Sequence, residues 1–106
     1  MKEKIHIITT EFKKQLSQIY QNRLSSVILF GSQARGDAEE FSDIDILVIL
    51  KGNVDFFKEL KNCSDIICEL SLKFDTVIAC IFEQEEKFQT EDTPLYRSIR
   101  REGVIL

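Results

Sequence analysis

The sequence has a single proline, and it contains no low-complexity segment, no internal repeat and no stretch typical of a linker. Its 106 residues are the length of one ordinary domain, so we expect a single domain over residues 1–106. Apolar residues make up 43% of the chain and charged residues 30%. A chain of this length and composition can bury a real hydrophobic core.

Long apolar runs are also absent. The N-terminal segment MKEKIHIITTEFKK has none long enough for a signal peptide, and we expect no membrane span. The three cysteines are odd in number and lack Cys-x-x-Cys spacing, which disfavours a disulfide framework and a zinc site. We therefore expect a cytoplasmic protein. The net charge of −4 gives no reason to expect direct binding of nucleic acid.

The spacing of the apolar residues predicts the helices and strands. Apolar residues recur every three or four positions between Ile5 and Ile19, which indicates an amphipathic helix over about 2–22. The other expected elements are strands at 27–30, 44–50 and 74–82, a short helix at 32–37, a helix capped by Asn53, a helix opened by Pro94 and a last edge strand at 104–106.

This order of elements, α-β-α-β-α-β-α-β, predicts the class of fold. Few residues separate the strands at 27–30 and 44–50, whereas parallel pairing needs a crossover of about a dozen or more residues. The sheet should therefore be mixed rather than regularly doubly wound. We expect a small α+β fold of two layers, in which helices cover at least one face of a mixed sheet.

Two aspartates open the most apolar predicted strand. Asp43 and Asp45 are two positions apart, so their side chains point to the same face of a strand. Carboxylates this close repel each other, and a divalent cation removes the repulsion. Such oxygen ligands suit Mg²⁺ or Mn²⁺ rather than zinc. The pair therefore predicts a metal site, although Asp-x-Asp by itself is often only a solvated acidic loop.

A Gly-Ser pair follows the preceding predicted strand. Glycine lets the backbone approach a ligand closely, and a helix that starts at Ser32 points N–H groups outwards, where they can bind phosphate oxygens. Gly31 and Ser32 would then hold the phosphates of a nucleotide, and Asp43 and Asp45 the metal that bridges them. Gly-Ser alone is an ordinary turn, but the joint pattern between two strands is much rarer than its parts.

A two-metal displacement would need a further carboxylate nearby. Asp75 is the best candidate for this third catalytic and metal-binding residue, because it stands at the start of the predicted strand 74–82. The prediction requires that this strand neighbours the strand at 44–50. Asp65 and Glu69 are weaker candidates, since they lie on a predicted helix whose solvated surface would satisfy them.

The motif GSQARG followed by SDIDILV resembles the signature of the minimal nucleotidyltransferases, which are small members of the DNA polymerase beta superfamily. The final segment LYRSIRREGVIL is similar to the closing helix and Glu-Gly-Val strand of that family. The resemblance runs from about Val27 to Leu106, with a catalytic core at about 27–82 and the C-terminal helix and strand at about 94–106. It implies a nucleotidyltransferase fold of the polymerase-beta type.

The resemblance also implies the roles of individual residues. A nucleoside monophosphate would pass from a nucleoside triphosphate to an acceptor, with release of pyrophosphate. Gly31, Ser32 and Arg35 of the first motif would bind the nucleotide, and Asp43 and Asp45 would bind Mg²⁺. The third carboxylate of the family lies in a strand of the Val-Asp-Leu-Val type. The nearest match here is Phe-Asp-Thr-Val at 74–77, which differs at its first residue.

Many proteins that this sequence resembles are MntA-like antitoxins, paired with HEPN-domain toxins that they adenylylate. The resemblance implies transfer of AMP from ATP onto such a partner protein. The alternative is a binding module that neutralises its partner by direct contact, with ATP as a structural ligand or absent. Transfer to a small molecule is disfavoured, because that activity normally needs an acceptor pocket from a second domain. A small sheet with a free edge is also compatible with a homodimer.

Overall fold

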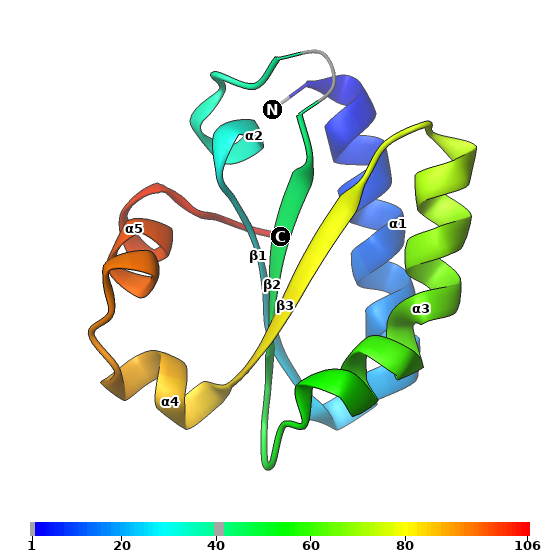
Figure 1. Cartoon of the computed structure of the whole chain (residues 1–106). Helices are drawn as coiled ribbons and strands as arrows, with labels where there is room; N and C mark the ends of the chain where they lie inside the picture. The colour runs from blue at the N-terminus through cyan, green and yellow to red at the C-terminus, as the bar shows by residue number, and fades with distance from the viewer. Residues whose placement is uncertain (1, 40–41) are drawn as a thin grey trace.

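The computed structural model describes residues 2–39 and 42–106, and over these residues the chain forms a four-stranded mixed sheet in the order β3-β2-β1-β4 (Figure 1). The central strand β1 is antiparallel to both of its neighbours, and β2 is parallel to β3. The mixed sheet and the α+β class predicted from the sequence are confirmed. The strands are β1 Leu24–Phe30, β2 Ile44–Leu50, β3 Ile78–Gln84 and β4 Val104–Ile105.

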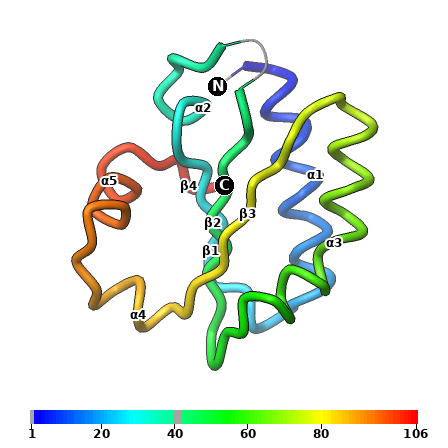
Figure 2. Tube along the Cα trace, in the orientation of Figure 1, coloured from blue at the N-terminus to red at the C-terminus, as the bar shows by residue number. Residues whose placement is uncertain are grey.

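The helices lie on both faces of this sheet, so the molecule has three layers rather than the two that the sequence predicted (Figure 1). They are α1 Glu3–Tyr20, the 3-10 turn η1 Gln21–Arg23, α2 Ser32–Arg35, α3 Phe56–Lys73, α4 Glu85–Thr90 and α5 Pro94–Glu102. The two long helices, α1 and α3, cover one face, and the shorter α4 and α5 lie on the other. Figure 2 shows β4 returning to the edge of β1, where Leu29 pairs with Val104.

The side chains of β2 alternate between two hydrophobic layers, as those of a fully buried strand do. Ile44 and Ile46 are fully buried in the larger cluster, with the apolar stripes of α1 and α3. Leu47 and Ile49 point to the opposite face, where they pack with Ile99 of α5. The odd-numbered positions of β2 therefore belong to the face of α4 and α5.

Two helices differ in detail from the sequence prediction. Asp55, rather than Asn53, caps α3, and its side chain accepts a hydrogen bond from the N–H of Lys58 at 3.3 Å. The charged stretch after β3 contains α4, for which no helix was predicted. This helix is short and has one large apolar residue, Phe88, so its sequence shows no apolar repeat. The ring of Phe88 packs on that of Tyr96, with the ring centroids 5.1 Å apart.

The third strand begins later than predicted. It starts at Ile78, and residues 74 and 75 instead form a turn that leaves α3. Asp75 has a φ of 49°, which is a left-handed backbone conformation rather than an extended one. The N–H of Thr76 donates to the carbonyl of Ser71 at 3.0 Å and closes the turn. Asp75 is therefore not a residue of the sheet.

Among the described residues, no helix has both the length and the apolar character that crossing a membrane requires.

Candidate active site

The aspartate pair lies where β2 begins. Asp45 is the second residue of the strand and is half-buried, and Asp43 precedes the strand and is exposed. Ile44 between them points into the core under α1 and α3, so the alternation of the strand places both aspartates on the opposite face. Burial raises the pKa of the Asp45 carboxyl, and the charge of Asp43 raises it further. The two predicted metal ligands are thus brought together.

The turn after β1 runs directly beside Asp45. Phe30, the last residue of β1, pairs with Asp45 across the two strands, and Gly31 follows it. Gly31 has a φ of 74° and a ψ of −157°, a region that only glycine adopts without strain. A Cβ atom at this position would overlap Oδ2 of Asp45 and lie 3.2 Å from its Cγ. Glycine is therefore needed here for both its backbone angles and its missing side chain.

The short helix α2 begins at Ser32, as the sequence predicted, with Gly31 as its N-cap. It is a single turn, in which the N–H groups of Ala34 and Arg35 both donate to the carbonyl of Gly31 at 3.1 Å. The N–H groups at a helix start have no acceptor within the helix, and this start lies beside Asp45. The binding of phosphate by Gly31 and Ser32 stays a prediction.

Arg35 lies close to the aspartate pair. Its positive charge lowers the pKa of Asp45, against the effects of burial and of Asp43. The guanidinium Nε is 3.2 Å from Asp37 Oδ2, and Nη1 is 3.7 Å from Glu102 Oε2. Both carboxylates raise the pKa of Arg35, Asp37 more strongly. Arg35 thus connects α2 with the end of α5, on the face that carries the aspartates.

Glu102 is a site residue that reasoning from the sequence missed. It is the last residue of α5, and Gly103 after it packs so closely that a Cβ atom there would lie 2.7 Å from Ile28 Cγ2. This packing holds the end of α5 against β1 and leaves Glu102 within reach of Arg35. The signal that the sequence offers is the final Glu-Gly-Val segment, which contains Glu102. Nothing in the sequence indicates that this segment lies beside position 35.

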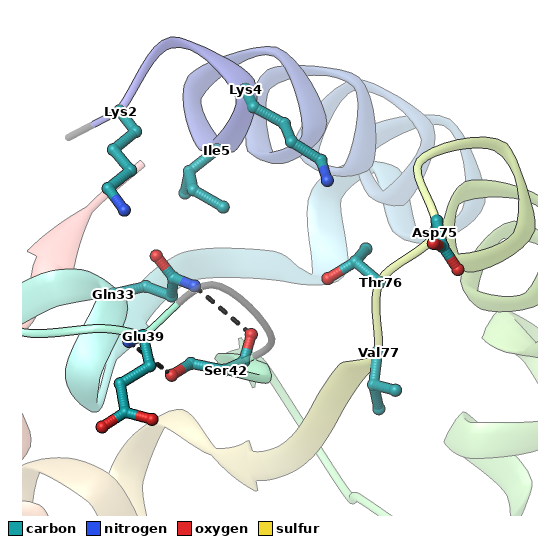
Figure 3. A pocket seen from close by; sticks show the side chains of 9 residues that line it. All are labelled: Lys2, Lys4, Ile5, Gln33, Glu39, Ser42, Asp75, Thr76 and Val77. Atoms are coloured by element: carbon teal, nitrogen blue, oxygen red, sulfur yellow. Dashed lines mark hydrogen bonds between the residues drawn. The ribbon is translucent and has the colours of Figure 1, made fainter.

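Asp75 is not brought into this group. It lies on the turn before β3 and lines a pocket of about 420 Å³, together with Lys4, Thr76 and other residues shown in Figure 3. Among the residues described as lining this pocket, neither Asp43 nor Asp45 is present. Over residues 2–39 and 42–106, no three acidic, histidine or cysteine side chains are grouped for one metal ion.

The carboxylate oxygens of Asp43 and Asp45 are of the kind that a hard divalent cation binds. Asp43 and Asp45 provide carboxylate oxygens on one face, and their repulsion would be relieved by a positive ion. Mg²⁺ is commonly bound by one or two protein carboxylates, while waters and substrate phosphates complete its shell. The pair could therefore hold Mg²⁺ or Mn²⁺ when phosphates supply further ligands.

A glycine turn against paired aspartates at one end of a mixed sheet is the arrangement of a nucleotidyltransferase. The family model described as Nucleotidyltransferase domain matches residues 9–106, and the chain belongs to this family. The resemblance to the minimal nucleotidyltransferases is thereby confirmed, and so is the expectation of an enzyme that transfers nucleotides.

Curated relatives of high similarity come from Methanocaldococcus jannaschii. The protein named "Putative protein adenylyltransferase MJ0604" is 41% identical over 97 residues, which are 91% of this chain and 91% of that protein. The protein named "Putative protein adenylyltransferase MJ0141" is 45% identical over 74 residues, which are 70% of this chain and 74% of that protein.

Solved structures share the fold. The crystal structure of a "putative nucleotidyltransferase from Sulfolobus solfataricus" aligns with a TM-score of 0.55 and 23% identity, over 99% of this chain and 87% of that one. A toxin–antitoxin crystal structure with AMP-PNP aligns with a TM-score of 0.61 and 20% identity, over 90% of this chain and 69% of that one. At these identities the structures establish the fold.

Proposed function

We propose that this chain transfers AMP from ATP to a hydroxyl group of a partner protein, and that Asp43 and Asp45 hold the Mg²⁺ or Mn²⁺ that the reaction needs. The partner is a HEPN-type toxin that the transfer silences, so the chain acts as its antitoxin. The observation that carries the proposal is that Asp45 lies against Gly31, with Asp43 and Arg35 beside it. We place the reaction in the cytoplasm, where free thiols such as Cys63, Cys68 and Cys80 stay reduced.

The names of the relatives support the acceptor class. Two relatives at 41% and 45% identity both carry the name "Putative protein adenylyltransferase". One fold neighbour is a toxin–antitoxin structure with a bound ATP analogue, which supports both the nucleotide and the kind of partner.

The residues of this chain would act by position and charge, which is how phosphoryl transfer is mainly catalysed. The acceptor oxygen forms a bond to the α-phosphorus of ATP. The bond between the α-phosphorus and the oxygen that bridges the α- and β-phosphates breaks, and pyrophosphate leaves. The hydroxyl proton passes to solvent. Arg35 and the start of α2 orient the phosphates, and a cation held by Asp43 and Asp45 would supply positive charge against them. Asp43 and Asp45 need the rigid strand β2 to keep their geometry.

The test is to incubate the purified chain with its HEPN-type partner, ATP and Mg²⁺, and to take intact masses of both proteins. We expect the partner to gain one or more AMP units, and the Asp43→Asn, Asp45→Asn double variant to abolish the gain. Asp65→Asn is the matched control, because Asp65 is exposed on α3, which covers the face of the sheet opposite to that of Asp45 (Figure 1). Unchanged masses with a stable complex would instead support neutralisation by contact.

A further inference from the structure

The strand pairing around the aspartates shows which residues stand beside them. β2 and β3 are parallel and in continuous register, with Ile44 opposite Ile78 and Asp45 opposite Ala79. Paired residues of neighbouring strands point to the same face of a sheet. Ala79 is thus the residue of β3 whose side chain stands next to Asp45.

The hydrophobic layers confirm this assignment of faces independently. Ile78 packs in the cluster under α1 and α3, while Ile81 packs with Leu47 on the face of α5. Odd-numbered residues of β3 therefore share the face of Asp45, as the register requires. On the other side, the residue paired with Asp45 is Phe30. Both neighbours of Asp45 in the sheet are apolar.

Other acids on this side of the molecule are engaged elsewhere. Glu102 and Asp37 both pair with Arg35. Glu83 is four residues beyond Ala79, roughly 13 Å along the strand, where it interacts with Tyr96. Asp75 lies outside the sheet on its turn. A third oxygen ligand for a second cation is therefore not supplied by the described neighbours of the pair.

We propose that this chain holds one divalent cation with two carboxylates, and that Ala79 occupies the position where a third carboxylate would complete a two-metal site. The inference rests on the proposed function, since it concerns the same aspartates. The single cation is the one that arrives with the triphosphate of ATP, because the phosphates supply the ligands that the protein does not. Activation of the acceptor hydroxyl is then left to the acceptor protein or to water.

The experiment counts Mn²⁺ ions bound to the chain in the presence of α,β-methylene-ATP, by electron paramagnetic resonance of free Mn²⁺ and by calorimetry. The wild type should bind one Mn²⁺ per complex, and Asp75→Asn should bind the same number with an affinity changed less than twofold. Ala79→Asp should bind two. Ala79→Asn is the matched control, with the same size and no charge, and should bind one.

The results distinguish failure of the single-cation inference from failure of the proposed function. Two Mn²⁺ ions on the wild type, reduced to one by Asp75→Asn, would overturn the inference and make Asp75 the third ligand. No Mn²⁺ on the wild type would overturn both the inference and the metal site of the proposed function. Thermal melts check that the variants fold; if Ala79→Asp does not, the wild type and Asp75→Asn still give the answer.

Discussion

The carboxylate of Asp45 lies against the backbone of Gly31, so that any side chain at position 31 would displace it. Gly31 directly follows β1, Asp45 lies in β2, and 14 positions separate them, but the antiparallel register of β1 and β2 makes them neighbours. The turn that is predicted to hold phosphate and the strand that is predicted to hold metal therefore share one contact.

Gly31→Ala should abolish transfer by moving Asp45. The new methyl group overlaps Oδ2 of Asp45, and the backbone angles of Gly31 add about 1–3 kcal/mol of strain. A displacement of a catalytic group by about 1 Å can lower a rate roughly 100-fold, and we expect a loss of at least this size. The rate of AMP transfer and the midpoint of urea unfolding would be measured together.

Gly52→Ala is the control for backbone strain. Gly52 has a similar φ of 80°, but a Cβ atom there meets nothing within 4 Å, and the residue follows the far end of β2. It should lose about 1–2 kcal/mol of stability and keep its transfer rate. If both variants lost activity equally, strain rather than contact with Asp45 would explain the effect.

Asp45→Asn should make the metal-free protein more stable at neutral pH. Burial and the charge of Asp43 raise the pKa of Asp45 in the folded state, so the folded protein binds more protons than the unfolded chain. Stability therefore falls as the pH rises above the ordinary pKa of an aspartate, about 3.9. The melting temperature of the variant should exceed that of the wild type at pH 7. The difference should shrink as the pH falls towards 4.

The same comparison has an outcome that contradicts the argument. If Asp45→Asn melted below the wild type at pH 7, attraction between Asp45 and Arg35 would outweigh burial and repulsion. Added Mg²⁺ and ATP should raise the melting temperature of the wild type but not of the variant, because a ligand stabilises only the state that binds it.

The parts of the fold that follow local patterns could be predicted from the sequence. β2 matches its predicted range of 44–50 because a continuous apolar run bounded by polar residues has few alternatives. The mixed sheet followed from the short connection between β1 and β2. The closeness of Gly31 and Asp45 could not be predicted, since it depends on the register of two strands.

The start of β3 shows where sequence reasoning fails. Phe74, Thr76 and Val77 all favour strands, but α3 runs on to Lys73 and the chain must reverse before it can pair with β2. The turn puts Asp75 in a left-handed conformation that aspartate tolerates better than most residues. Tertiary packing therefore overrides the local strand propensity. As a result, Asp75 does not take the strand position that was predicted for the third carboxylate.

Arg35→Ala should weaken ATP binding more than it weakens the fold. The ion pairs of Arg35 with Asp37 and Glu102 are partly exposed, and such pairs contribute little to stability. Loss of a charged contact to phosphate should raise the KM for ATP at least about tenfold. Removing the guanidinium also removes the group that lowers the pKa of Asp45, so the acidic limb of the pH–rate profile should move to higher pH.

Arg101→Ala is the matched control for Arg35→Ala. Arg101 contacts the other oxygen of Glu102 at 3.5 Å, but it is more exposed than Arg35 and does not affect the pKa of Asp45. Its KM and pH profile should equal those of the wild type. A similar change in both variants would mean that disturbing Glu102, not losing Arg35, causes the effect.

Tyr20→Phe should destabilise the protein without changing the reaction. The Tyr20 hydroxyl donates to the carboxylate of Glu59 at 3.2 Å, and Glu59 is only 1% exposed. This pair lies where α1 and the start of α3 meet, near the end of β2 that is farther from Asp45. Loss of a hydrogen bond to a buried charge should cost about 1–3 kcal/mol in urea unfolding.

Tyr96→Phe should cost less, because its partner Glu83 is half-buried. A slower AMP transfer by folded Tyr20→Phe protein would show that this end of the sheet also positions the active site.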